Sequence, residues 1–196
     1  MSISESYTKI GELESAVRDH INTGRYQSDL IQNSQNWYQI CSSLDVIGDT
    51  SYAIQSYMDG GFPSDPGLQY IYTYGVLQAL FVQQDAIENL TEAFDLQYSR
   101  PNSLTKIRQL RNASIGHPTK QGRGKRTTFN FISRMTMSKN GFDLLRHSDE
   151  KSYEMVSVDI PQIVEDQFEE IVIGYGTIVE KLRQSDKEHK DNYKDK

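Results

Sequence analysis

The sequence lacks several features that are typical of secreted or membrane-spanning proteins. It has a single cysteine, Cys41, among 196 residues, so no disulfide can form within it. It has no run of eighteen apolar residues, the length that crosses a membrane as a helix. The segment from Met1 to Asp19 lacks the apolar core of a secretory signal. We therefore expect a protein of a reducing compartment, the cytoplasm, with no membrane-embedded part.

Common cofactor and metal motifs are also missing. The glycines at Gly122 and Gly124 lack the strand–loop–helix context of a phosphate-binding loop. His20 and His147 stand outside any cluster of potential ligands, so we expect no metal and no cofactor. Cys41 lies on an apolar helical stripe, which favours packing over a role as a nucleophile.

Acidic residues are absent from one long stretch. The whole chain has a net charge of −6, yet Leu96 to Phe142 contains no Asp or Glu. The remainder carries 11 basic and 27 acidic residues. This polarity predicts a positive region facing an anionic partner, unless the clustering arises by chance. The ten basic residues of the stretch are Arg100, Lys106, Arg108, Arg111, Lys120, Arg123, Lys125, Arg126, Arg134 and Lys139.

Apolar residues recur at helical spacing over most of the chain, which predicts a mainly α fold built as a helical bundle. We expect helices over residues 2–22, 29–58 and 68–96. Glycines and prolines between residues 59 and 67 stop the second helix, so the two long helices must lie antiparallel. Tyr70, Tyr72 and Tyr74 suit partial burial with hydroxyls in water, although such rings can also stack on bases.

The second half predicts a short helix, a small sheet and a last long helix. Asn102 or Ser103 is expected to cap a helix that runs to about Ile115. Short apolar strands and a Lys139-Asn140-Gly141 turn predict an antiparallel sheet inserted at about 127–158, with strands over 127–137, 142–145 and 153–158. Pro161 opens the last helix, which runs to about Leu182. We therefore predict one domain over 1–185 and a charged flexible tail over 186–196.

The short helix carries the best candidate site. Leu104, Ile107, Arg111 and Ser114 share one helical face, which directs Arg111 partly inward. A guanidinium in that position needs a partner, and no acid lies within fifteen residues in the sequence. The partner must come from another helix, where Asp85 or Glu88 are candidates, from another subunit, or from a phosphate.

His117 follows Gly116, where the helix is expected to stop. That break would let the imidazole turn back toward Arg111. An imidazole exchanges protons near neutral pH, and a guanidinium binds a phosphoryl group well. Asn112 can position the substrate or the imidazole by hydrogen bonding. Together Arg111, Asn112 and His117 suit metal-independent RNA cleavage, in which the ribose hydroxyl attacks its own phosphate.

Two further observations concern the specificity of this signal. Arg183 and His189 repeat the same spacing in an acidic tail without a helix break, and they serve as an internal comparison. The basic side chains near the motif are candidate RNA-phosphate contacts, with a solvated loop as the alternative. These residues are Arg108, Lys120, Arg123, Lys125 and Arg126.

The segment Leu110-Arg111-Asn112, followed by His117-Pro118, resembles the motif of the HEPN superfamily of helical domains. The resemblance covers roughly residues 28–185, with the predicted sheet as an insertion or subgroup feature. It implies catalytic Arg111 and His117, a supporting Asn112, and a homodimer in which the two motifs share one cleft. It also implies a ribonuclease of a toxin–antitoxin, phage-defence or RNA-processing system, with an antitoxin or regulatory protein as a further partner.

Other interpretations of the same residues remain open. The chain could be a non-catalytic helical module that binds RNA, a nucleotide or a protein through its positive region. It could also be a dimerisation scaffold in which Arg111 pairs with an acid across the interface. At the level of single residues, Arg111 and His117 could simply stabilise the end of a helix.

Overall fold

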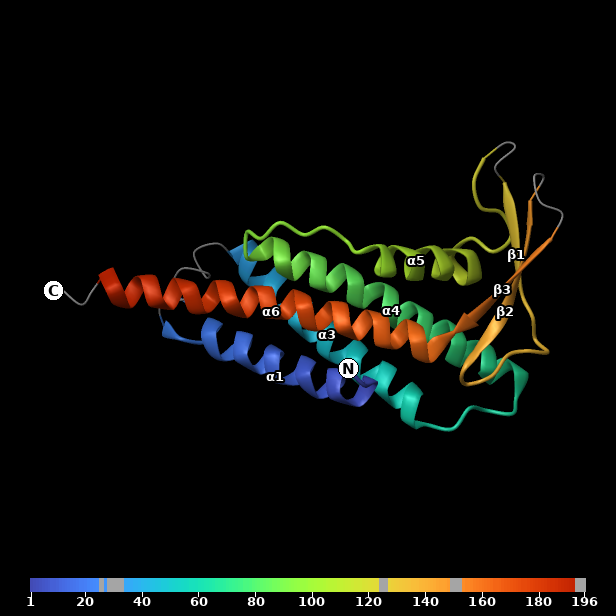
Figure 1. Cartoon of the computed structure of the whole chain (residues 1–196), viewed down its shortest axis with the longest axis horizontal. Coiled ribbons are helices and arrows are strands. Elements are labelled where there is room, and N and C mark those ends of the chain that lie inside the picture. Colours follow the sequence, from blue (N-terminus) through green and yellow to red (C-terminus); the bar gives the residue numbers. More distant parts are fainter. Residues whose placement is uncertain (25–26, 28–33, 124–126, 149–152, 193–196) are drawn as a thin grey trace.

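The computed structural model describes residues 1–24, 27, 34–123, 127–148 and 153–192. It shows a mainly α protein with a small antiparallel sheet just before the last helix, as the sequence predicts. Four long helices run along the long axis of an elongated bundle, and the sheet stands at one end (Figure 1). They are α1 (Ile3–Ile21), α3 (Ser34–Asp59), α4 (Pro66–Ala93) and α6 (Ile160–Asn192).

The helices pack as two pairs around one core. Helix α3 packs along α4 as an antiparallel hairpin, and α1 packs along α6. Contacts between α4 and α6 join the two pairs. The apolar stripes of all four helices face inward, so burial of these stripes drives the bundle together. The core includes Ile10, Val17, Leu44, Ile54, Leu80, Ile87, Leu90, Phe168, Ile171 and Tyr175, none more than 1% exposed.

Polar residues fix where α1 and α4 begin. Ser2 and Glu5 form a reciprocal capping box at the start of α1. At the start of α4, the Asp65 carboxylate accepts a hydrogen bond from the amide of Leu68 at 2.9 Å. Pro66 occupies the first turn, where its missing donor has no cost. The Asp65-Pro66-Gly67 segment, interpreted in the sequence as a stop, therefore also starts the next helix.

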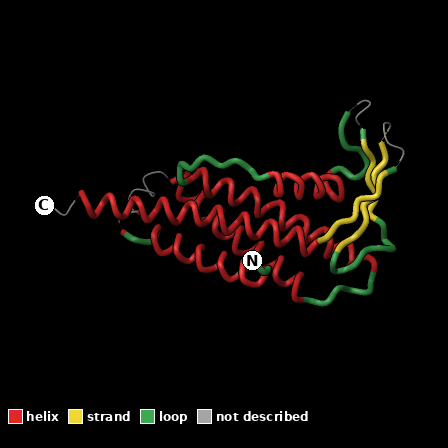
Figure 2. The backbone as a smooth tube through the Cα atoms, in the orientation of Figure 1, coloured by secondary structure: helices red, strands yellow, loops and turns green. Residues whose placement is uncertain are grey.

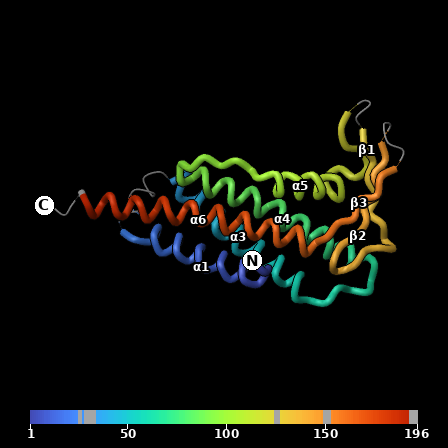
Figure 3. Tube along the Cα trace, viewed as in Figure 1, coloured from blue at the N-terminus to red at the C-terminus, as the bar shows by residue number. Residues whose placement is uncertain are grey.

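The short helix α5 (Asn102–Arg111) lies against α4 and α6, and its C-terminal end reaches the sheet (Figure 3). The predicted side-chain cap at Asn102 or Ser103 is wrong. Pro101 occupies the capping position, with no side-chain bond to the helix. The Ser103 hydroxyl instead donates to the Glu170 carboxylate of α6 at 3.0 Å, which ties α5 to the bundle.

The sheet contains β1 (Thr128–Ile132), β2 (Gly141–Ser148) and β3 (Glu154–Asp159), paired antiparallel in that order (Figure 2). The predicted turn is confirmed, since Ser138 and Gly141 form a bridge around Lys139 and Asn140. Strand β1 ends five residues earlier than predicted. The amide of Ser133 bonds to the carbonyl of Asp143 at 2.9 Å, and the chain then leaves the ladder in a turn.

Helix α6 continues well past the predicted boundary at residue 185. It remains helical to Asn192, so the predicted end of this helix at about Leu182 is wrong. His20 of α1 lies 3.2 Å from the Asp186 carboxylate, and the Gln184 amide donates to Glu188 at 3.0 Å. These contacts give the polar extension local support. The predicted tail residues 193–196 lie outside the described residues.

Across the described ranges, no helix combines the length and the apolar character needed to cross a membrane.

Candidate active site

Arg111, the last residue of α5, is held against α4 by neutral groups. Its Nη2 and Nε atoms donate to Oε1 of Gln78 at 2.6 and 3.2 Å. Its Cζ atom lies 4.2 Å from the centre of the Phe81 ring, a cation–π distance. As predicted, Arg111 shares a face with the buried Leu104 and Ile107 and is half-buried itself.

No carboxylate balances this guanidinium in the part of the chain that the structure describes. The inward position predicted a partner from another element, and α4 supplies one. The partner is an amide oxygen rather than an acid. An amide orients the guanidinium and leaves its positive charge uncompensated, so the site retains its attraction for an external anion.

The chain immediately after Arg111 forms a π-helical turn, η1 (Asn112–Gly116). Its defining bond runs from the amide of His117 to the carbonyl of Asn112, at 2.7 Å. The Oδ1 atom of Asn112 accepts from Nη1 of Arg111 at 3.0 Å. Asn112 therefore contacts both neighbours, with its side chain on Arg111 and its carbonyl on the backbone of His117. π-Turns inside helices occur frequently at functional sites.

Gly116 sits directly against the guanidinium. A methyl group at this position would lie 2.8 Å from Nη1 of Arg111 and 3.2 Å from Oδ1 of Asn112. The absence of a side chain therefore allows the arginine to occupy its place. Because His117 is the next residue, the turn brings the backbone of His117 close to the Arg111 head group.

His117 itself is exposed to solvent. Within the described residues its imidazole shares no hydrogen bond with Arg111, so the expected direct contact between the two side chains is not formed. The segment is nevertheless anchored, because the amide of Asn130 in β1 donates to the carbonyl of Pro118 at 2.8 Å. The imidazole thus stands on a fixed backbone at the junction of α5 and the sheet.

The acids considered as partners for Arg111 bind other arginines. The Asp85 carboxylate lies 2.6 Å from Nη1 of Arg108, and Glu88 pairs with Arg100. The Cζ atom of Arg108 also lies 3.8 Å from the Phe81 ring centre. Arg108 was predicted to contact RNA, but its charge is compensated within the chain, which makes it a support of the site.

The predicted basic loop is only partly described. Lys120 and Arg123 are exposed on the segment that leads into β1, where Gln121 bridges to Thr128. Both remain suitable for phosphate contacts. Lys125 and Arg126 lie outside the described residues.

The other residues considered in the sequence, Cys41 and His147, lie in surroundings that favour packing. Burial, with the nearby Asp45 carboxylate adding to it, raises the pKa of Cys41 and disfavours the nucleophilic thiolate. The His147 ring lies between Phe129 and Tyr153, at centroid distances of 6.3 and 4.9 Å. Searching the described residues finds no group of three or more His, Cys, Asp or Glu that could hold a metal ion.

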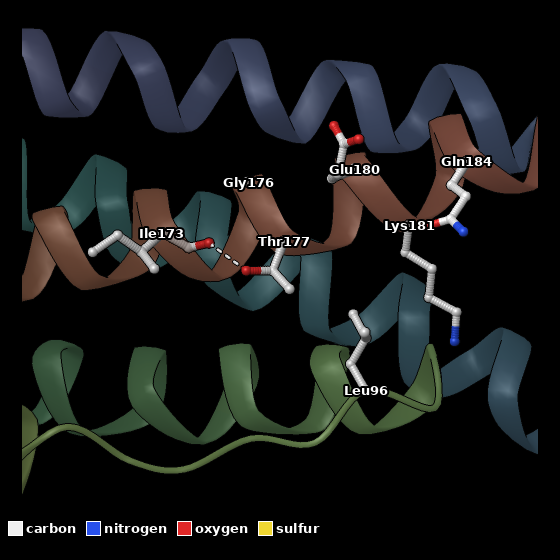
Figure 4. A pocket seen from close by; sticks show the side chains of 7 residues that line it. All are labelled: Leu96, Ile173, Gly176, Thr177, Glu180, Lys181 and Gln184. Carbon is white, nitrogen blue, oxygen red and sulfur yellow. Dashed lines mark hydrogen bonds between the residues drawn. The ribbon is translucent and has the colours of Figure 1, made fainter.

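A groove of about 590 Å³ is lined by residues of α6 from Ile173 to Gln184 and by Leu96 (Figure 4), on the part of α6 that lies away from the sheet (Figure 1). Two of its polar side chains already bond to backbone carbonyls. Thr177 donates to the carbonyl of Ile173 at 3.1 Å, and Lys181 bonds to the carbonyl of Phe94 at the end of α4. In this groove the cation Lys181 is therefore used to bind the end of α4, unlike Arg111 at the end of α5.

Comparison with known proteins adds no assignment, since no protein-family model, no curated protein and no solved structure matches the chain.

Sequence reasoning found Arg111 and His117 but missed Gln78 and Phe81. Gln78 is 33 residues from Arg111 and carries no charge, so nothing in its local sequence marks it. The spacing of Tyr74, Gln78, Phe81 and Asp85, three or four residues apart, would have placed them on one face of α4.

Proposed function

We propose that this chain is a metal-independent endoribonuclease of HEPN type. The observation that carries the proposal is the uncompensated Arg111 guanidinium, held by Gln78 and Asn112 and packed against Gly116, the residue before the exposed His117. A cation without an internal counter-charge, packed against the turn that carries an exposed imidazole, suits a phosphodiester substrate better than a role in stability.

The chemistry is an internal transesterification. The ribose 2′-oxygen attacks the adjacent phosphorus and loses its proton, and the bond from phosphorus to the 5′-oxygen breaks. The products are a 2′,3′-cyclic phosphate and a 5′-hydroxyl. His117 is the group suited to proton exchange, either with the 2′-hydroxyl or with the leaving 5′-oxygen. Arg111 stabilises the charge that builds on the non-bridging phosphate oxygens.

A homodimer belongs to this proposal, with the two Arg111–His117 motifs facing one cleft. A dimer would supply the second proton-transfer group that a single imidazole cannot provide in the same step. The toxin or phage-defence setting, and an antitoxin or regulatory partner, follow from the HEPN resemblance alone. Crosslinking between cysteines introduced at position 119, next to the motif, would test whether the motifs face each other.

The deciding experiment is cleavage of a mixed RNA pool in EDTA. Wild-type protein should produce fragments that end in 2′,3′-cyclic phosphate, and Arg111→Ala and His117→Ala should lose this activity while circular dichroism shows an intact fold. Equal cleavage by both variants would overturn the proposal.

A non-catalytic binding module is the second candidate, and a specific observation favours it. Arg111 already has two side-chain partners, and no bond connects it to His117. This alternative predicts RNA or nucleotide binding that weakens with salt but yields no product.

A further inference from the structure

A row of side chains extends from Arg111 along the surface of α4. Tyr70, Tyr74, Gln78 and Phe81 are four, four and three residues apart, so they share one face of the helix. We call this row the α4 stripe. The Tyr70 and Tyr74 rings pack edge to face with centroids 5.6 Å apart. Tyr70 also packs on the core, whereas 41% of Tyr74 stays exposed to solvent.

An arginine lies over each end of the α4 stripe. At the Phe81 end it is Arg111, described above. At the other end Arg134, from the connection after β1, donates from Nε to the Tyr70 hydroxyl at 3.3 Å and lies 5.9 Å from the ring centre. Phe81 lies eleven residues after Tyr70, which corresponds to roughly 16 Å of helix. Two cations thus bracket an exposed aromatic ring.

These two arginines differ from neighbouring arginines in whether a carboxylate compensates their charge. Among the described residues neither Arg111 nor Arg134 has a carboxylate partner. One and two turns beyond Phe81 on α4, Asp85 and Glu88 neutralise Arg108 and Arg100. The uncompensated positive surface therefore ends beyond Phe81 and extends along the α4 stripe toward Tyr70.

We propose that the α4 stripe binds single-stranded nucleic acid that flanks the scissile phosphate. A base stacks on Tyr74, and backbone phosphates lie at Arg134 and Arg111. Aromatic rings within a positive groove are the usual means of binding single strands, because bases of any sequence can stack. Bases within a duplex are already stacked and cannot use such a ring. This inference rests on the proposed function only for the identity of the phosphate at Arg111.

Charge distinguishes this occupant from a protein. An exposed tyrosine between arginines can also anchor a protein interface. A second copy of the chain that covered the stripe by itself would bring uncompensated arginines together with no counter-charge, whereas in the proposed dimer the bound nucleic acid supplies that counter-charge. A nucleic acid strand supplies a negative charge at every nucleotide, which complements the α4 stripe along its length.

The test uses a short, fluorescently labelled single-stranded oligodeoxynucleotide and the full-length protein. DNA has the same bases and phosphates but lacks the 2′-hydroxyl, so it binds without being cleaved. Affinity is measured by fluorescence anisotropy for Tyr74→Ala and Arg134→Gln. The matched controls are Tyr38→Ala on α3, where the tyrosine is 70% exposed, and Arg183→Gln on α6, where the arginine is exposed.

Tyr74→Ala should raise the Kd by about tenfold, the loss expected for one stacked base. Arg134→Gln should raise the Kd and also reduce its dependence on salt by about one phosphate contact. Both controls should stay close to wild type, and a duplex of the same sequence should bind more weakly.

Several results would overturn the inference. They are an absence of oligonucleotide binding by the wild type, equal effects of Tyr74→Ala and Tyr38→Ala, and equal affinity for single strand and duplex. A Tyr74→Ala variant that keeps its affinity but changes its oligomeric state in gel filtration would assign the α4 stripe to a protein interface instead.

The outcome is separable from that of the proposed function. If RNA is never cleaved but oligonucleotide binding depends on Tyr74 and Arg134, the inference holds and the proposed ribonuclease fails. If RNA is cleaved and the stripe variants bind like wild type, only the inference fails.

Discussion

The chain contains the same arginine–histidine spacing twice, in two different settings. Arg111 and His117 flank a π-turn at the end of α5, whereas Arg183 and His189 lie within the regular helix α6. In a continuous helix, residues six apart point about 120° away from each other. The π-turn replaces that geometry with a backbone bond from His117 to Asn112 and a glycine against the guanidinium. The same spacing therefore places the two residues differently in the two settings, and the turn at the end of α5 packs its glycine against the arginine.

The largest expected effect separates the two motifs by activity. Arg111→Ala and His117→Ala should each lower RNA cleavage by at least about 100-fold, because they remove charge stabilisation and proton transfer. Arg183→Ala and His189→Ala should cleave like wild type. Initial rates on one RNA pool in EDTA provide the measurement. If Arg183→Ala and His189→Ala lose as much activity as Arg111→Ala and His117→Ala, the two motifs cannot be distinguished by function.

The next prediction concerns Gly116. An added methyl group would lie 2.8 Å from Nη1 of Arg111, so Gly116→Ala should displace the guanidinium. A displacement of about 1 Å can cost on the order of 100-fold in rate, so we expect a loss of about 10- to 100-fold. The atom displaced is the end of a flexible side chain, so the melting temperature should change little.

Gly176→Ala in α6 is the matched control, since a methyl group there meets nothing within 4 Å. Removing a helical glycine should stabilise the protein by about 0.5–1 kcal/mol and leave cleavage unchanged. If Gly116→Ala retains full activity, the close packing of Arg111 on the turn has no role in function.

Much of the fold was predictable because it depends on periodic burial. The apolar stripes located α1, α3, α4 and α6 to within a few residues at most of their ends. The sheet was located by its strand-like residues and by the Lys139-Asn140-Gly141 turn. Strand ends were less accurate, since β1 stops at Ile132 and the amide of Asp143 then donates to the Thr136 hydroxyl instead of to a strand carbonyl. Such tertiary bonds leave no signal in local sequence.

The candidate site was predictable only in its own segment. The inward direction of Arg111 followed from its position on the stripe with Leu104 and Ile107. The partner Gln78 did not, because a neutral side chain 33 residues away has no distinctive pattern. The π-turn was also missed, since Gly116 and Pro118 indicate that a helix ends but not how its last turn is wound. Local composition nominates candidate groups, and tertiary packing determines what holds them.

A third prediction asks what the neutral partner of Arg111 contributes. Gln78→Ala removes the bonds at 2.6 and 3.2 Å and should lower cleavage about tenfold, since a hydrogen bond to a charged group contributes about 1.5–3 kcal/mol. Gln78→Glu keeps an acceptor but compensates the guanidinium charge, so it should be at least as damaging. Gln184→Ala, which breaks a comparable side-chain bond on α6, is the control.

The two Gln78 variants separate orientation from charge. If orientation alone matters, Gln78→Glu retains activity and Gln78→Ala does not. If the uncompensated charge matters, Gln78→Glu also weakens binding of the single-stranded oligodeoxynucleotide, and added salt has less effect on the affinity that remains. Activity equal to wild type in both variants would show that Gln78 does not position Arg111 for catalysis.

The smallest effect is expected at the α6 motif. Removing residues 184–196 deletes Asp186, whose contact with His20 joins the end of α6 to α1 at 3.2 Å. Partly exposed ion pairs contribute only about 0–1 kcal/mol, which for a chain of this size lowers the melting temperature by no more than about 4 °C. RNA cleavage should be unchanged.

Asp186→Asn should reproduce a similar small decrease in thermal stability if this contact is the cause. Lower cleavage by the shortened protein at a temperature where it is fully folded would mean that the acidic end of α6 contributes to the site, and the contrast between the two motifs would then be one of degree.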